Sequence, residues 1–345
     1  MKLDTLLLSR PADAATQARF LADTGIDGLF SVEGVNDPFT GLTVAATAVD
    51  VDLYTNIAVA FPRSPMTTAY QSWDLQGLTG GRFSLGLGTQ VRANVERRYG
   101  ATWSNPVERM REFVTATKAI FDCWQHGTRL DFRGEHYTHT LMQPTFNPGA
   151  VEGGPPPVLV GALGPRMTRM ATEVADGILL HPFTTERYLR DEQWPRVDEG
   201  LHDTGRSKNA FTVVCEAIVC TGRDEDELAE AEAGVRGLLA FYGSTPAYRA
   251  PLELHGYGDL QPELNRLAKE GRWDEMTGLI DDDLLRTFAV HGSPAEVGAE
   301  AHPPLRGDGR PHRLLPALRR AARPGGRDHR VVPRRCWPKR RLRAS

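Results

Sequence analysis

The stretch that decides the fold is Thr79-Gly80-Gly81-Arg82-Phe83-Ser84-Leu85-Gly86-Leu87-Gly88-Thr89-Gln90. A turn at Gly80-Gly81 leads into a short apolar segment that ends in glycine and two polar residues. Such a segment is typical of a buried parallel strand that presents backbone and hydroxyl groups to a ligand at its carboxyl end. A second segment of the same design is Val158-Leu159-Val160-Gly161-Ala162-Leu163-Gly164. Two such segments in one chain point to an α/β barrel that binds a cofactor.

Strand-like and helix-like segments alternate along residues 1–300. Apolar and β-branched runs predict strands at 4–8, 28–32, 52–61, 83–88, 158–161, 177–181 and 211–221. Amphipathic segments predict the principal helices at 38–49, 65–77, 107–125, 166–175, 185–203, 224–242, 284–288 and 294–300. Because strands that alternate with helices form parallel sheets, we expect an α/β fold. The length and the number of strands favour a (β/α)8 (TIM) barrel over an open doubly wound sheet.

Two segments interrupt this alternation. Residues 128–157 hold an alternating stretch around Gly134 and then a run rich in glycine and proline, so we expect a hairpin insertion there. Residues 246–282 are polar and mixed, and we expect a helical excursion. We therefore expect one barrel domain over residues 1–300 that carries both insertions.

A basic tail stands where the eighth strand and its helix should be. Residues 301–345 contain thirteen Arg, one Lys and two Asp, a charge of +12 in a chain whose net charge is -3. We expect this Arg- and Pro-rich tail to be disordered and to replace the eighth unit. Three origins are open: a nucleic-acid-binding arm, a solvated extension, or the product of a shifted reading frame in a GC-rich gene. The abrupt change in composition favours the shifted frame.

Composition and cysteine spacing exclude several classes of protein. With 40% hydrophobic and 25% charged residues, the chain is typical of a globular protein. The four cysteines form no CxxC pair, which argues against a zinc knuckle or a disulfide framework. The amino-terminal apolar run is too short for a signal peptide, and no run reaches the ~18 residues of a membrane span. We expect a cytoplasmic enzyme with a small-molecule substrate and no membrane partner.

Polar and glycine residues gather at the predicted carboxyl ends of the strands, where a barrel of this kind has its active site. The polar residues are Glu33 after strand two, Thr89 and Gln90 after strand four, Asn94 one turn further, and His181 after strand six. The loop Gly161–Gly164 precedes a helix, and its backbone N–H groups predict an anion site. Each residue also has a purely structural interpretation, as a cap, a turn or a core histidine. Glu135, His136 and His139 lack a fourth partner, so we expect no metal.

Five stretches together are similar to a known family: Gly81–Thr89, Gly161–Met167, Val174–Phe183, Ile26–Phe30 and Ala60–Pro65. The chain resembles the luciferase-like monooxygenase superfamily over about residues 1–298. More narrowly, it resembles the actinobacterial branch that uses the deazaflavin coenzyme F420. The resemblance implies a TIM barrel with insertions, with the cofactor ring across the barrel mouth.

The resemblance also implies which residues contact that cofactor. Its phosphate-bearing arm would meet Gly161, Ala162, Leu163, Gly164 and His181, whereas Thr89, Gln90 and Asn94 would lie near the ring. Members of the family often carry a non-prolyl cis peptide bond in strand three, behind the ring. Asn56–Ile57 is the matching bond in this sequence.

One departure from the family pattern limits the substrate that can be inferred. The sugar-phosphate dehydrogenase branch has a histidine after the acidic residue of strand two, whereas Gly34 follows Glu33 here. Sugar-phosphate dehydrogenation is therefore not assigned. Glu33 is the candidate catalytic residue, as a proton partner.

We therefore expect an oxidoreductase that moves a hydride between coenzyme F420 and a small organic substrate. The alternatives are an FMN-dependent luciferase-like monooxygenase, which would activate oxygen, and an inactive truncated barrel. The oligomeric state is left open, although relatives commonly pair as homodimers. Nucleic acid is disfavoured as a partner because no basic surface interleaved with aromatic residues appears outside the tail.

Overall fold

The computed structural model describes residues 2–300 and 312–317 of the chain. These residues form two compact units. Unit 1 comprises residues 2–180, 196–214 and 312–313, and unit 2 comprises residues 181–195, 215–300 and 314–317. Strand β10 (Thr212–Thr221) begins in unit 1 and ends in unit 2.

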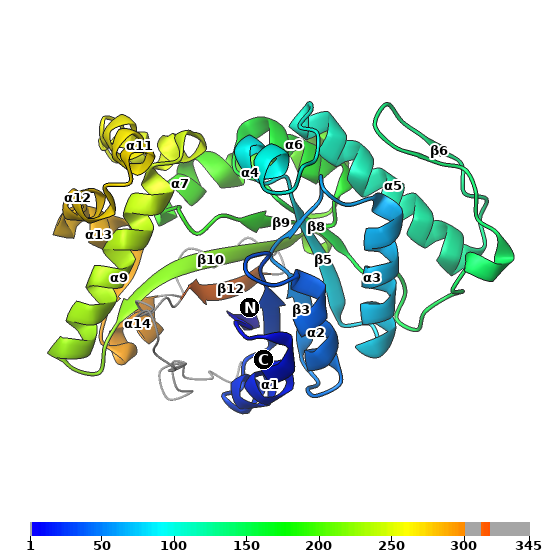
Figure 1. Ribbon diagram of the computed structural model, residues 1–345, viewed down its shortest axis with the longest axis horizontal. Helices are drawn as coiled ribbons and strands as arrows, with labels where there is room; N and C mark the ends of the chain where they lie inside the picture. Colours follow the sequence, from blue (N-terminus) through cyan, green and yellow to red (C-terminus); the bar gives the residue numbers. More distant parts are fainter. Residues whose placement is uncertain (1, 301–311, 318–345) are drawn as a thin grey trace. The chain divides into compact units, whose positions relative to one another are not determined.

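Unit 1 is built on a parallel sheet (Figure 1). Its strands are β1 (Lys2–Leu6), β2 (Gly28–Ser31), β3 (Asp52–Thr55), β4 (Ala58–Val59), β5 (Phe83–Gly88), β8 (Val158–Gly161) and β9 (Gly177–Leu180). Parallel pairs join them in the order β1-β2-β3-β5-β8-β9, with β4 beside β5. The Thr212 N–H donates to Asp176 O, which continues this order into the start of β10. Sequential parallel neighbours are the order expected of a (β/α)8 barrel, and the predicted α/β fold is confirmed.

Helices connect these strands. They are α1 (Ala14–Asp23), α2 (Pro38–Ala46), α3 (Pro65–Leu78), α4 (Arg92–Arg97), α5 (Pro106–His126), α6 (Pro165–Val174) and α8 (Trp194–Asp203). Helices α2, α3, α5 and α6 each begin with a proline, whose missing N–H is not needed in a first turn. Asp37 caps α2, and Ser64 caps α3. Helix α2 packs on β2 and β3, and α3 packs on β5 (Figure 1).

Strands β3 and β5 approach each other closely at Gly86. A Cβ on Gly86 would stand 1.9 Å from the Thr55 carbonyl oxygen, so this position requires glycine. The Thr55 hydroxyl donates to Gly86 O at 2.7 Å and accepts from the Gly86 N–H at 2.9 Å. The pair fixes the register of β5, and with it the position of the residues that follow its carboxyl end.

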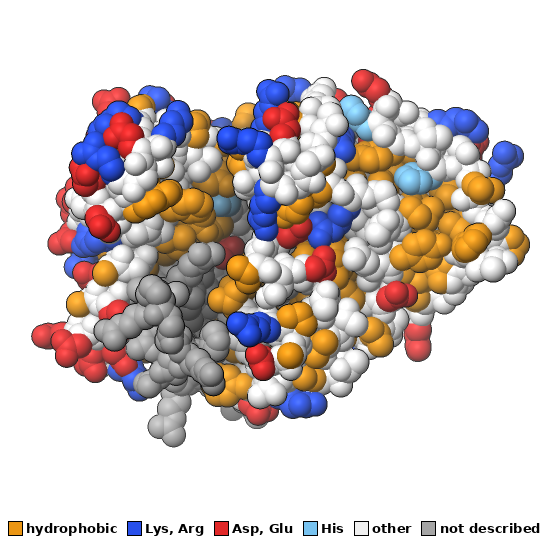
Figure 2. Space-filling model, in the orientation of Figure 1, with side chains coloured by type: hydrophobic (Ala, Val, Ile, Leu, Met, Phe, Trp, Pro, Cys, Tyr) orange, Lys and Arg blue, Asp and Glu red, His pale blue; other side chains and the backbone are white. Residues whose placement is uncertain are grey.

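The segment from 128 to 157 contains the antiparallel hairpin of β6 (Phe132–Arg133) and β7 (Thr138–His139). The Glu112 carboxylate on α5 holds its turn, because it accepts hydrogen bonds from the N–H groups of Glu135, His136 and Tyr137. Leu141 and Phe146 are exposed in the same segment. Figure 2 shows hydrophobic side chains on the surface that Figure 1 labels α5 and β6.

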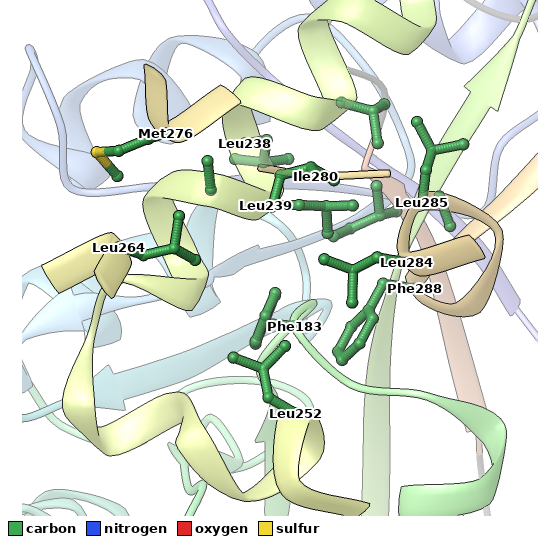
Figure 3. Packing of buried hydrophobic residues seen from close by; sticks show 14 of the residues in the cluster. Phe183, Leu238, Leu239, Leu252, Leu264, Met276, Ile280, Leu284, Leu285 and Phe288 are labelled. Atoms are coloured by element: carbon green, nitrogen blue, oxygen red, sulfur yellow. The ribbon is translucent and has the colours of Figure 1, made fainter. Parts of the chain in front are cut away.

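Unit 2 is mainly helical. It contains α7 (Glu186–Tyr188), α9 (Glu225–Gly243), α10 (Arg249–Leu254), α11 (Leu260–Glu270), α12 (Trp273–Gly278), α13 (Asp282–Phe288), α14 (Pro294–Glu300) and β11 (Ala289–Gly292), which pairs in parallel with the end of β10. Its core gathers apolar side chains from helices α9 to α13 and from β10 and β11 around Phe183, Leu239 and Phe288 (Figure 3). The expected helical excursion at 246–282 contains α10, α11 and α12.

The structure corrects three expectations. The strand expected at 52–61 is divided into β3 and β4 on either side of Asn56–Ile57. Strand β11 was not predicted, because Ala-Val-His-Gly is too short a run to show a period. The tail was expected to contain no strand, yet residues 312–317 form β12 (His312–Ala317). Its sequence, His-Arg-Leu-Leu-Pro-Ala, has only a short apolar run among basic residues. The rest of the tail, residues 301–311 and 318–345, lies outside the described residues.

Candidate functional site

Ile57 lies where the carboxyl ends of β3, β5 and β8 meet in unit 1. The peptide bond between Asn56 and Ile57 is cis, which confirms that prediction. A Cβ on Gly88 would stand 2.7 Å from Ile57 Cδ1, and a Cβ on Gly161 would stand 3.5 Å from Ile57 Cγ2. The glycines that end β5 and β8 therefore pack against Ile57, and the structure brings these three residues together.

Glu33 follows β2, and its carboxylate is already hydrogen-bonded. Its side chain is only 7% exposed. Oε2 accepts from the Val59 N–H and from Arg63 Nη1, both at 2.6 Å, and Oε1 accepts from the Tyr99 hydroxyl at 2.8 Å. A buried carboxylate with three donors is well stabilised where it stands. Its role as a proton partner stays a prediction.

Thr89 and Gln90 directly follow β5 and hydrogen-bond locally through their side chains. Gln90 has φ 61°, which puts a residue with a side chain in the left-handed region, at a cost of about 1–2 kcal/mol. Its Oε1 accepts from the Val91 N–H, and the Thr89 hydroxyl donates to Gln90 O. Such strain clusters at functional sites. Asn94, on α4 one turn further, is partly buried.

The loop Gly161–Gly164 leads into α6, and only part of it is free to bind an anion. The Ala162 N–H donates to Leu179 O at 3.2 Å, so this amide is already used. Gly164 precedes α6 without a side-chain cap, and a Cβ on Gly164 would meet no atom within 4 Å. The amino end of α6 is therefore open beside Gly164, as an anion site at a helix N-terminus requires. Anion binding at this loop stays a prediction.

His181 is the first residue of unit 2 and is held by aromatic side chains of that unit. Its ring lies 4.1 Å from the Tyr248 ring and 4.7 Å from the Tyr242 ring, between centroids. The Phe183 N–H donates to His181 Nδ1 at 3.1 Å, which leaves the proton of a neutral ring on Nε2. Burial lowers the pKa of His181 to about 4. His181 is therefore a neutral hydrogen-bond donor near pH 7.

Two residues of this site were missed by the sequence analysis. Arg63 donates through Nη1 to Glu33 and to Val59 O, and through Nη2 to Asp37. Tyr99 donates to Glu33, and burial together with that hydrogen bond raises its pKa to about 12. Arg63 stands in one of the stretches that carry the family resemblance, but nothing in the sequence distinguishes Tyr99.

A cavity of about 420 Å³ lies elsewhere in unit 1. Its lining includes Pro157, Asp176 and Thr212, which stand at the amino ends of β8, β9 and β10. The residues of unit 1 that are predicted to contact the cofactor stand at the carboxyl ends of strands instead. Active sites of (β/α)8 barrels lie at the carboxyl ends, so this cavity is not the candidate site.

The described residues hold no cluster of three or more His, Cys, Asp or Glu side chains that could bind a metal ion. In the hairpin, the Glu135 and His136 backbones bind Glu112. Within the same described ranges, every helix is too short or too polar to span a bilayer.

Comparisons with known proteins agree with this fold. The chain is 49% identical over 293 residues to an uncharacterized protein of Mycobacterium tuberculosis, a match that covers 85% of this chain and 86% of the relative. It is 27% identical over 285 residues to the 5,10-methylenetetrahydromethanopterin reductase of Archaeoglobus fulgidus, with 80% of each chain covered.

A solved structure is also similar, that of the coenzyme F420-dependent tetrahydromethanopterin reductase from Methanopyrus kandleri. The TM-score is 0.74 at 21% identity, and the match covers 91% of this chain and 92% of the other. At this identity the likeness shows a shared fold. The family model described as luciferase-like monooxygenase matches residues 3–303. Because that match spans most of the sequence, the chain belongs to the luciferase-like monooxygenase family.

Proposed function

We propose that the protein is an oxidoreductase that transfers a hydride between coenzyme F420 and a small organic substrate. The observation that carries this proposal is the meeting of Ile57, Gly88 and Gly161 at three neighbouring strand ends. Glycines at two of these ends let the Ile57 side chain lie close against the strand backbones, and a side chain held there would support a flat ring system. Similarity to two reductases, one of them a coenzyme F420-dependent enzyme, supports the choice of cofactor.

The residues present suit a deazaflavin with an anionic arm. When bound, the deazaflavin supplies the hydride chemistry, and the protein binds and orients it. The uncapped start of α6 beside Gly164 would hold the phosphate. Thr89, Gln90 and Asn94 would hydrogen-bond the polar edge of the ring. A contact between His181 and the cofactor stays a prediction.

Titration of the purified full chain with F420 and, separately, with FMN tests the proposal. Deazaflavin fluorescence should show saturable binding of F420 that is at least about tenfold tighter than binding of FMN. Gly164→Asp adds a side chain and a negative charge at the start of α6. It should weaken F420 by about tenfold and leave binding of the deazaflavin nucleoside that lacks the phosphate nearly unchanged.

Gly41→Asp is a matched control for this charge. Gly41 lies in α2, and a Cβ there would also meet no atom within 4 Å. This variant should bind F420 like the wild type. Equal loss of affinity in both variants would argue against an anion site at α6.

One alternative is a monooxygenase that uses FMN, and the family description favours a monooxygenase. Tighter binding of FMN than of F420, with oxygen consumption in the presence of reduced FMN, would support it. Failure to bind either cofactor would point to an inactive barrel.

A further inference from the structure

We propose that Glu33 is a positioning residue, not the proton partner: it holds the Asn56–Ile57 segment and α4 in place for the cofactor. This inference rests on the proposed function and assigns a role within its site. It concerns unit 1 alone. The argument starts from the hydrogen bonds that Glu33 makes.

Glu33 holds the chain on both sides of Ala58. Its backbone N–H donates to Ile57 O at 3.3 Å, and its carboxylate accepts from the Val59 N–H at 2.6 Å. Asn56 is the first residue of the cis peptide bond, and its N–H donates to Ser31 O at 2.7 Å. The end of β2 therefore fixes the segment that carries Ile57 at successive points.

Arg63, four residues after Val59, binds the same carboxylate. Its Nη1 donates to Glu33 Oε2 at 2.6 Å and to Val59 O at 2.8 Å. Its own side chain is 15% exposed, so the ion pair lies largely out of water. Charge-assisted hydrogen bonds in such surroundings are stronger than neutral ones. The segment from 57 to 63 is thus tied to Glu33 at its start and at its end.

The second carboxylate oxygen reaches a different part of the chain. Tyr99, just after α4, donates to Glu33 Oε1 at 2.8 Å. Arg98 donates to Gly34 O at 2.6 Å, and its guanidinium lies 5.0 Å from the Tyr99 ring centroid. The Arg98 and Tyr99 N–H groups both donate to Asn94 O. Glu33 and its neighbour therefore hold the end of the helix that carries Asn94.

These contacts argue against proton transfer at Glu33. Oε2 faces two donors, Val59 N–H and Arg63, and a proton added there would displace one of them. Oε1 faces the Tyr99 hydroxyl, whose high pKa keeps the proton on the phenol. Leaving a buried donor without its acceptor is costly, so the carboxylate is better suited to hold structure than to exchange protons.

Hydrogen exchange measured by mass spectrometry on the full chain tests the positioning role without any cofactor. Glu33→Gln replaces one acceptor oxygen with an NH2 group, which donates hydrogen bonds and cannot accept them. Exchange should rise about tenfold in residues 57–63 and in α4. Tyr99→Phe removes a single contact, and exchange should rise in α4 alone. If Glu33→Gln fails to fold, Arg63→Lys tests the same contact from its other side: it should weaken the bond to Glu33, and exchange should rise in residues 57–63.

Glu112→Gln is the matched control. Glu112 is also a carboxylate that accepts three hydrogen bonds in unit 1, but its donors belong to the hairpin turn. In Glu112→Gln, hydrogen exchange should rise in residues 134–139 and not in residues 57–63. The F420 dissociation constant should increase about tenfold in Glu33→Gln and less than twofold in Glu112→Gln.

The outcomes separate this inference from the proposed function. Unchanged exchange in 57–63 and α4 of Glu33→Gln would overturn the positioning role. If exchange rises in these segments of Glu33→Gln while its affinity for F420 is unchanged, Glu33 does not position them for the cofactor. If the wild type binds no F420, the proposed function fails, and the exchange pattern still decides whether Glu33 positions these segments.

Discussion

The side chain of Ile57 fills the space in which a Cβ on Gly88 would stand. The distances from that position are 2.7 Å to Ile57 Cδ1 and 2.8 Å to Ile57 Cγ1. Real Cβ atoms do not approach other carbons so closely, so Gly88→Ala should overpack the strand ends and destabilise the protein by about 1–3 kcal/mol. Urea unfolding measures this change in the free energy of unfolding.

The same contact predicts a specific rescue. Ile57→Ala alone should cost about 1–2 kcal/mol, because the partly buried Ile57 side chain loses its packing against Gly88 and Gly161. With Ile57→Ala in place, Gly88→Ala should cost almost nothing, which gives a coupling free energy of at least about 1 kcal/mol. Strictly additive effects would contradict the contact. Gly41→Ala, in an open helical position, is the control and should be neutral or stabilising.

The local features of this site could be predicted from the sequence, whereas its long-range contacts could not. Strands β5 and β8 begin and end where their apolar runs and glycines predict. The site residues at strand ends followed from this alternation, since the barrel order fixes where strands point. By contrast, Arg63 and Tyr99 reach Glu33 from 30 and 66 residues away. No hydrophobic period or short motif predicts such a contact, because it depends on how the loops fold over the strand ends.

The hairpin insertion should depend on one carboxylate. Glu112→Gln removes an acceptor from the N–H groups of Glu135, His136 and Tyr137, so we expect a loss of about 1–2 kcal/mol in the free energy of unfolding. Chemical denaturation measures the loss. The control is Glu108→Gln on the same helix, whose ion pair with Arg111 is partly exposed and should contribute less than about 0.5 kcal/mol. Equal losses in both variants would contradict the anchoring role of Glu112.

The buried cysteines should resist thiol reagents while the protein is folded. Burial raises the pKa of Cys215 to about 12 and that of Cys220 to about 11, and Cys123 is buried as well. The thiolate is the reactive species, so few of these groups are reactive at pH 8. In a Cys336→Ser background, Ellman's reagent should modify the three thiols at least about a hundredfold faster in denaturant than in buffer. Rapid labelling without denaturant would contradict the burial of these thiols.

His181 should make unit 2 less stable in mild acid. Its folded pKa of about 4 lies below the ordinary value of 6.5, so between these values the unfolded chain binds more protons than the folded one. Stability is therefore complete above pH 6.5 and is lost as the pH falls toward 4. The difference of about 2.5 units corresponds to about 3 kcal/mol in total, of which about 2 kcal/mol should be lost between pH 7 and pH 5. His181→Gln, which still offers an oxygen to the Phe183 N–H, should lose correspondingly less stability over that interval in urea titrations.

The exposed His126→Gln is the control and should keep the wild-type dependence of stability on pH, because it leaves His181 in place. An unchanged pH dependence in His181→Gln would show that the ring is not held neutral between Tyr242 and Tyr248.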